Sequence, residues 1–245
     1  MAENAAEKVK PYSQDGSKKE QIAQMFDNIS GNYDLLNHLL SMNIDKGWRR
    51  RAVKLLRPYQ PKVLLDVATG TGDFAVELMA LNPTSIKGID ISAGMLEVGK
   101  QKMVKRKLAD VIDLQLGDAE HLPFGDEHFD GITVAFGVRN FENLVAGLTD
   151  MRRVLKKGFP VAILEFSKPR SFPMKQIYNF YFKFILPTIG KVVSKDSRAY
   201  TYLPESVNAF PEGDDFIQIM REVGYSNIRE HRLTFGIATI YLAEK

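Results

Sequence analysis

Residues 62–75 read KVLLDVATGTGDFA, and this stretch decides the fold. It begins as an apolar, β-branched run, turns at a Gly-rich loop and continues into a helical pattern. That succession is typical of the first strand-to-helix turn of a doubly wound α/β sheet, where such sheets bind their ligands. Gly70 and Gly72 carry no Cβ atoms, so a nucleoside can lie against the backbone there.

Strands and helices alternate from this point on. Four more strand candidates follow, and helical stretches separate them: 86–91, 111–117, 129–136 and 160–166. Ser92 is a natural helix N-cap, and Gly158 ends the last of these helices. Residues 227–235 and 237–245 are two strands joined by a tight turn at Gly236, which predicts an antiparallel hairpin. We therefore predict an α/β fold with a seven-stranded, mostly parallel sheet that ends in this hairpin.

The segments around the sheet complete one domain. We expect residues 1–20 to be a flexible N-terminus, because they are charged and polar and contain proline and glycine. Residues 21–60 have the pattern of N-terminal helices with a break near Asn43. Residues 167–213 form a helical insertion after the fifth strand. The prediction is a single domain over 21–245.

The composition excludes several classes of protein. The 33 lysines and arginines exceed the 30 aspartates and glutamates only slightly, so a dedicated nucleic-acid binder is not indicated. Because the chain has no cysteine, it can form no disulfide, thiolate nucleophile or cysteine metal site. Its four histidines lack the spacing of a metal site. No apolar run reaches about 18 residues, and no signal peptide is visible. We expect a cytoplasmic protein without a metal.

The glycine loop is compatible with two cofactors. Gly70, Gly72 and Ala75 also match the dinucleotide pattern G-x-G-x-x-A. Asp66, at the end of the first strand, would repel a pyrophosphate but suits the ammonium group of a methionine moiety. The closing hairpin also differs from a dinucleotide-binding fold. S-Adenosylmethionine is therefore favoured over a nicotinamide dinucleotide, with Asp66, Thr69, Gly70 and Gly72 as its contacts in this loop.

Two more aspartates follow later strands. Asp90 ends the second strand, where both ribose hydroxyls can donate to its carboxylate. The alternative role for Asp90 is that of a helix-capping acid. Asp118 follows the third strand and can accept from the adenine amino group, with Ala119 supplying a backbone contact; the alternative for Asp118 is an ordinary turn residue.

Three further stretches carry a resemblance to a known family: YDLLNHLLSMNIDKGW at 33–48, AFGVRNF at 135–141 and RVLKKGFPVAILEFS at 153–167. With these stretches the chain resembles the UbiE/MenG quinone-biosynthesis C-methyltransferases, from about Phe26 to the C-terminus. Leu36 and Asp45 stand where the family signature has Met and His, and Ala135 stands where a cofactor-contacting serine is frequent. Only a backbone contact to the cofactor carries over to Ala135.

The resemblance implies a class I S-adenosylmethionine-dependent methyltransferase fold, with S-adenosylhomocysteine as product. The implied reaction is C-methylation of a lipid-soluble prenylated quinol, demethylmenaquinol in menaquinone biosynthesis. The benzoquinol of ubiquinone biosynthesis is the close alternative. Two other classes stay open: a cofactor-binding protein without catalysis, and a nicotinamide reductase.

The tip of the fourth strand carries the candidate catalytic residues. An apolar strand that ends in Arg139 and Asn140 presents them to the ligand crevice, because ligands lie beyond the carboxyl ends of parallel strands. Arg139 stays protonated, so we expect it to orient a water or hold a developing oxyanion while Asn140 fixes the ring oxygen. Tyr33 is a third candidate by resemblance. The alternative for Arg139 is a salt bridge to Glu165.

The insertion contains an amphipathic stretch, MKQIYNFYFKFIL at 174–186. On a helix, its aromatic and aliphatic side chains form one broad face and leave a narrow polar stripe. This face could contact the inner face of the cell membrane, line a tunnel for a prenyl tail, pack a homodimer or pack in the core. The basic run KGWRRR at 46–51 could add attraction to anionic lipid, or it could be a solvated helix face.

Overall fold

The fold is built on one seven-stranded sheet. The computed structural model describes residues 5–13, 15–34, 43–185 and 198–245. The strand order is β3-β2-β1-β4-β5-β7-β6; β7 pairs antiparallel with β5 and β6, and the other pairs are parallel. The predicted sheet and hairpin are confirmed. The strands are β1 (Val63–Val67), β2 (Ser85–Asp90), β3 (Ile112–Leu116), β4 (Gly131–Ala135), β5 (Pro160–Phe166), β6 (Ser226–Leu233) and β7 (Ala238–Glu244).

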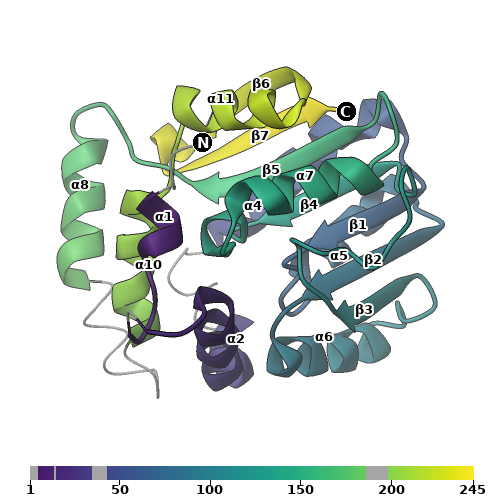
Figure 1. The fold of residues 1–245 in the computed structure, drawn as a ribbon, viewed down its shortest axis with the longest axis horizontal. Helices are drawn as coiled ribbons and strands as arrows, with labels where there is room; N and C mark the ends of the chain where they lie inside the picture. Colours follow the sequence, from purple (N-terminus) through teal and green to yellow (C-terminus); the bar gives the residue numbers. More distant parts are fainter. Residues whose placement is uncertain (1–4, 14, 35–42, 186–197) are drawn as a thin grey trace.

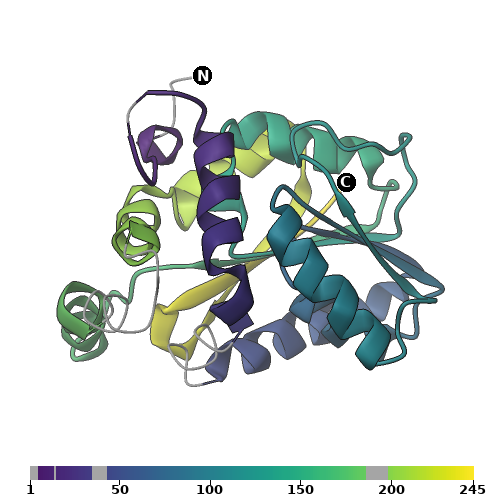
Figure 2. The same ribbon diagram turned by 90° about the horizontal axis from the view of Figure 1, so that it is seen from below.

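Helices cover both faces of this sheet, as Figures 1 and 2 show. On one face lie α4 (Ile44–Leu56), α5 (Asp73–Leu78) and α6 (Ala93–Lys105). On the other face lie α7 (Leu144–Val154) and α11 (Asp214–Val223). Because both faces are covered, successive strand residues are buried in opposite directions: Leu64 belongs to the core under α4, and Leu65 to the core under α7.

The remaining helices gather beyond the carboxyl ends of the parallel strands, at the left of Figure 1. They are α1 (Ala5–Lys8), α2 (Lys18–Ile29), α8 (Met174–Phe180) with the π-helical turn η5 (Tyr181–Ile185), and α10 (Arg198–Ala209). Ligands of such sheets bind at this edge. These helices therefore form the outer wall of any site there.

Part of the N-terminus that we predicted to be flexible is packed. Ser17 caps α2 by accepting from the Glu20 N–H at 3.4 Å. The Lys18 side chain is buried, and its Nζ donates to the carbonyls of Ala6, Arg139 and Phe141 at 2.8, 3.0 and 3.0 Å. Burial lowers the pKa of Lys18 to about 8. The three carbonyls replace the water that this ammonium would otherwise bind, which makes its burial possible.

The amphipathic stretch is split between two environments. Tyr178 is buried, whereas Phe180 and Phe184 are 57% and 53% exposed. The helix continues to Ile185, and residue 186 of the predicted stretch lies outside the described residues. Within the described residues, none of the helices combines the length and apolar character needed to cross a bilayer.

Candidate active site

Asp66 is held rigidly beneath the glycine loop. Its carboxylate accepts from the Thr69 hydroxyl and from the Thr133 hydroxyl, each at 2.6 Å, and the residue is 1% exposed. The loop folds over it because Thr69 N–H donates to the Ile89 carbonyl on the neighbouring strand, at 2.9 Å. Residues from two strands and the loop thus fix one buried carboxylate.

The structure brings Asp90 to the same loop. The Gly70 N–H donates to one Asp90 oxygen at 2.8 Å, and the Ser92 N–H donates to the other at 2.9 Å. Gly70 and Gly72 have φ of 57° and 81°, a conformation that glycine adopts without steric cost. Ser92, not Asp90, caps α6 with its side chain, so the helix-capping alternative for Asp90 does not describe its contacts.

These two carboxylates suit a cationic ligand that brings hydroxyl donors. Burial raises the pKa of both Asp66 and Asp90 to about 6, because each ionised carboxylate has lost its water. A ligand ammonium or a sulfonium compensates for that loss, and a ribose diol can donate to the remaining lone pairs. The donor set at this loop therefore fits S-adenosylmethionine better than an anionic dinucleotide.

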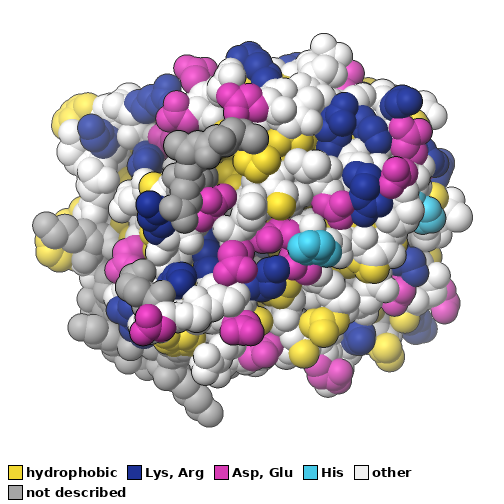
Figure 3. Space-filling model, in the orientation of Figure 1, with side chains coloured by type: hydrophobic (Ala, Val, Ile, Leu, Met, Phe, Trp, Pro, Cys, Tyr) yellow, Lys and Arg dark blue, Asp and Glu magenta, His cyan; other side chains and the backbone are white. Residues whose placement is uncertain are grey.

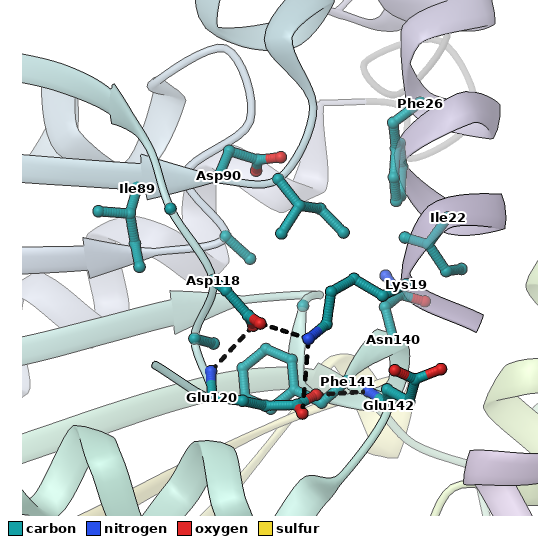
Figure 4. A pocket seen from close by; sticks show the side chains of 15 residues that line it. Lys19, Ile22, Phe26, Ile89, Asp90, Asp118, Glu120, Asn140, Phe141 and Glu142 are labelled. Atoms are coloured by element: carbon teal, nitrogen blue, oxygen red, sulfur yellow. Dashed lines mark hydrogen bonds and ion pairs between the residues drawn. The ribbon is translucent and has the colours of Figure 1, made fainter. Parts of the chain in front are cut away.

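A cavity of about 50 Å³ lies beside Asp90 and is drawn in Figure 4. Asp118 and Ala119 line it on the strand side, as expected for the adenine end. Asp118 accepts from the Glu120 N–H at 3.0 Å and pairs with Lys19. Although burial acts in the opposite direction, the hydrogen bond from Lys19 lowers the pKa of Asp118.

Helix α2 forms one side of this cavity, which was not predicted from the sequence. Lys19, Ile22 and Phe26 all point into it, as Figure 4 shows. The available signal was the capping pair Ser17 and Glu20, which marks the start of a helix within the stretch assigned to the flexible N-terminus. The N-terminal segment is therefore part of the candidate site.

The turn after β4 packs directly against the start of the glycine loop. A Cβ at Gly137 would lie 2.5 Å from the Ala68 Cβ, so no larger residue fits there without movement. Ala135 ends β4 and is half-buried; it is not among the residues that line the two cavities of this site. The short helix η4 (Val138–Asn140) follows and separates these cavities.

Arg139 and Asn140 follow each other in η4, and both side chains donate to the Phe136 carbonyl. Arg139 lines a second, larger cavity, whereas Asn140 lines the smaller one. Asn140 Oδ1 accepts from the Tyr202 hydroxyl at 3.0 Å, and its Nδ2 donates weakly to the Phe136 carbonyl at 3.4 Å. The two predicted catalytic residues are adjacent, and each reaches a different compartment.

The salt bridge that we considered as the alternative role of Arg139 is present. Its Nη1 donates to Glu165 Oε1 at 2.8 Å and to the Phe136 carbonyl at 2.5 Å. Glu165 is fully buried, and burial raises its pKa although Arg139 opposes this. Arg139 Nε makes no hydrogen bond within the described residues. The guanidinium is thus fixed through Nη1, and its Nε–H remains as a donor without an acceptor among the described residues.

The larger cavity measures about 350 Å³ and is mainly aromatic. Trp48, Phe136 and Phe166 form one wall, with the Phe136 and Phe166 rings stacked at 4.4 Å and Arg139 Cζ 5.5 Å from the Phe166 ring centre. The insertion forms the opposite wall through Tyr178, Tyr181, Phe182, Tyr202 and Leu203.

Tyr33 stands where the two cavities approach each other. It lines the larger one, and its Cε1 lies 4.0 Å from the place a Cβ would take at Gly70. Its ring packs edge-on against Phe26, with centroids 5.9 Å apart, and Phe26 lines both cavities. The third predicted catalytic residue therefore lies between the glycine loop and the aromatic cavity.

Known proteins are similar to this chain in sequence and in fold. The chain is 51% identical over 240 residues to the demethylmenaquinone methyltransferase of Bacteroides fragilis, covering 98% of both chains. It is 50% identical over 230 residues to the ubiquinone/menaquinone biosynthesis C-methyltransferase UbiE of Geotalea daltonii, covering 93% of this chain and 97% of that one. The fold is similar to that of the [4+2]-cyclase SpnF, with a TM-score of 0.66, 15% identity and coverage of 93% and 96%.

A family model describes nearly the whole chain. Residues 14–245 match the model of the ubiE/COQ5 methyltransferase family, so both the N-terminal helix α2 and the insertion fall within the matched region. This family assignment confirms the S-adenosylmethionine-dependent methyltransferase that the sequence predicted. The chain belongs to the ubiE/COQ5 methyltransferase family.

Proposed function

We propose that this protein methylates a ring carbon of a prenylated quinol, converting demethylmenaquinol to menaquinol in menaquinone (vitamin K2) biosynthesis. The 2-polyprenyl-6-methoxybenzoquinol of ubiquinone biosynthesis is the alternative substrate. One observation carries the proposal: an aromatic cavity of about 350 Å³ shares the η4 wall with the cofactor cavity. An apolar cavity of this kind suits a flat, uncharged ring with a hydrocarbon tail.

The chemistry requires a nucleophilic ring carbon. S-Adenosylmethionine, when bound, supplies an electrophilic methyl group. A quinol carbon attacks such a methyl group once negative charge develops on the neighbouring ring oxygen. Arg139, fixed by Glu165 and the Phe136 carbonyl, holds a guanidinium at the cavity wall where it can stabilise that oxygen. Asn140 positions Tyr202 and the turn, and Tyr33 bounds the ring on the side of the glycine loop.

Methyl transfer from labelled S-adenosylmethionine to each of the two quinols tests the proposal. We expect labelled, alkali-stable C-methylated product from demethylmenaquinol. Labelled product from the benzoquinol alone would select the alternative substrate. Cofactor binding by calorimetry without transfer to either quinol would instead identify a cofactor-binding protein without catalysis. Binding of a nicotinamide dinucleotide in the same calorimeter would favour a reductase.

The insertion provides a route for a prenyl tail. Ile177 and Tyr181 line the cavity, while Phe180 and Phe184 point outward from the same helix. Hydrophobic atoms show at the left margin of Figure 3, where α8 lies in Figure 1. We propose that this outer face rests on the inner leaflet of the cell membrane, so that the tail passes from lipid to cavity without crossing water.

Changing both Phe180 and Phe184 to Ser should weaken binding to anionic lipid vesicles at least about a hundredfold, because insertion of each ring contributes about 1.5 kcal/mol or more. Co-sedimentation measures this, and turnover of a tail-less quinol should be unchanged. Val104 and Leu116 are also more than half exposed but lie on α6 and β3, so their serine variants serve as the control. If the Phe180/Phe184 variant and the Val104/Leu116 variant bound the vesicles equally well, the outer face of α8 would not be the membrane anchor.

Cofactor affinity should depend on pH through Asp66 and Asp90. Their pKa values are raised to about 6, so both carboxylates are ionised above pH 7 and lose their charge as the pH falls through 6. Affinity for S-adenosylmethionine should therefore be constant from pH 7 to 8 and fall by up to about a hundredfold per unit below about pH 6, because two carboxylates take up protons. Calorimetry between pH 5 and 8 measures this. A constant affinity over that range would contradict the assignment of these two residues.

A further inference from the structure

The larger cavity is lined by a charged pair, Asp45 and Arg49, to which the proposed function assigns no role. Among its described lining residues, the polar side chains are hydroxyls, two guanidiniums and a single carboxylate, Asp45. The other polar members are Tyr33, Arg49, Arg139, Tyr178, Tyr181, Tyr202 and Thr234. Asp45 is 3% exposed, which is unusual for an aspartate on the first turn of a helix.

Asp45 is held in place from the cofactor side. The Nη1 of Arg49, one turn further along α4, donates to its Oδ2 at 2.7 Å. The Nη2 of the same guanidinium lies 3.7 Å from Oδ2 of Asp73, which begins the helix after the glycine loop. Lys102 in turn donates to Asp73 at 2.7 Å. This chain of charges fixes the rotamer of Asp45 relative to the loop that binds the cofactor.

The aromatic wall places a ring next to this carboxylate. Trp48 follows Asp45 by three residues on the same helix, and its ring lies 6.0 Å from that of Phe136. Phe136 in turn stacks on Phe166, over which Arg139 lies. Asp45 and Arg139 therefore both line the cavity that these aromatic rings bound. A hydroxylated ring stacked on them has a proton-accepting carboxylate and a guanidinium in the same cavity.

We propose that Asp45 is the proton acceptor for the quinol hydroxyl; this inference rests on the proposed quinol methylation. Several other groups in or near the cavity are unsuited to the role. Arginines do not give up their protons, so Arg49 and Arg139 cannot accept another. Burial raises the pKa of Tyr178, Tyr181 and Tyr202, so these hydroxyls stay protonated. Glu165 is absent from the described lining and lies behind Arg139.

The proposed step balances with one proton released. The hydroxyl O–H bond breaks and its proton passes to an Asp45 oxygen, while the ring carbon forms its bond to the methyl carbon. The C–S bond breaks, and its electron pair stays on sulfur. The substituted carbon then loses its hydrogen to water as a proton, and Asp45 returns its own proton to the ring oxygen. The ring is again a quinol, now methylated, and the sulfonium charge has been replaced by one released proton.

Asp45→Asn is the first test, because asparagine keeps an oxygen that accepts from Arg49 but cannot take up a proton. We expect kcat to fall by about 10²-fold to 10³-fold, with the calorimetric affinity for S-adenosylhomocysteine close to that of the original protein. The melting temperature should fall, because the buried Arg49 loses its charged partner. If Asp45 had only a structural role, Asp45→Asn should leave kcat unchanged. That result would overturn the proposal while quinol methylation by the unchanged protein continued to support the proposed function.

Two further measurements separate proton acceptance from positioning. The defect of Asp45→Asn should shrink by at least about tenfold with a halogenated quinol whose hydroxyl is already ionised at the assay pH. Asp45→His should regain activity at high pH, because a neutral imidazole can accept a proton. The groups whose charge bears on this recovery are Arg49, Asp73, Lys102, Asp66, Arg139 and Tyr33. An equal defect with both quinols and no regained activity in Asp45→His would reject the role.

Discussion

Arg139→Met should lower kcat by about 10²-fold to 10³-fold and, in the same variant, destabilise the fold by about 3 to 5 kcal/mol. The kinetic effect follows from the role that we propose for Arg139, because the variant lacks the guanidinium that would stabilise the developing oxyanion. The second effect has a different cause. Glu165 is fully buried and accepts from Arg139 at 2.8 Å, so removing the arginine leaves a buried carboxylate without its partner. Denaturant unfolding and single-turnover methyl transfer measure the two effects separately.

The matched control is the double variant Arg139→Met with Glu165→Gln. Glutamine carries no charge, so the double variant no longer buries an unpaired carboxylate. It should therefore recover most of the stability that Arg139→Met loses. Activity should remain at the level of the single variant, because the guanidinium is still missing. Recovery of kcat together with stability would show that Arg139 acts only by neutralising Glu165. The two roles that the sequence left open for Arg139 are therefore separable by experiment.

Asp66→Asn should weaken binding of S-adenosylmethionine by at least about 10²-fold and raise the stability of the ligand-free protein at pH 7.5. We propose that the Asp66 carboxylate attracts the cationic cofactor, so its loss should lower affinity. Without the cofactor the same charge is desolvated, and a pKa raised from 3.8 to about 6 corresponds to about 3 kcal/mol of destabilisation. The sign follows from proton binding: between pH 3.8 and 6 the folded state binds more protons than the unfolded state, so stability falls as pH rises.

Calorimetry and thermal unfolding in the absence of cofactor measure these two opposed changes. Asp113→Asn is the control, because Asp113 pairs with Lys87 on the surface with 57% of its side chain exposed. That variant should change neither quantity appreciably. A less stable Asp66→Asn would show that the hydrogen bonds from Thr69 and Thr133 outweigh the desolvation of the charge.

The two cavities share Phe26 and the η4 turn. Phe26 lines both cavities, Arg139 lines the larger one and Asn140 lines the smaller one. Lys18 donates to the carbonyls of Arg139 and Phe141, so the N-terminal segment and the η4 turn are held together. A change in α2 should therefore affect the position of Arg139 as well as the covering of the cofactor cavity.

The sequence by itself determined the sheet, the hairpin and the meeting of the glycine loop with Asp90. Each follows from local rules: strand periodicity, the φ that Gly70 adopts, and the shared edge at which parallel strands end. The motifs around Arg139 also pointed to the family before any geometry was known. These features lie within a few residues of one another or are fixed by strand order.

Only the tertiary structure decided which distant residues share a cavity. Lys18 lies 121 residues from Arg139 in the chain, and Glu165 lies 26 residues from it, yet both bind it. Asp45 enters the same aromatic cavity on a helix that precedes the sheet. Periodicity shows which face of a helix is buried but not which partner covers it, because partners of similar size and charge satisfy the same local pattern. Packing selects among them, and packing is a property of the whole chain.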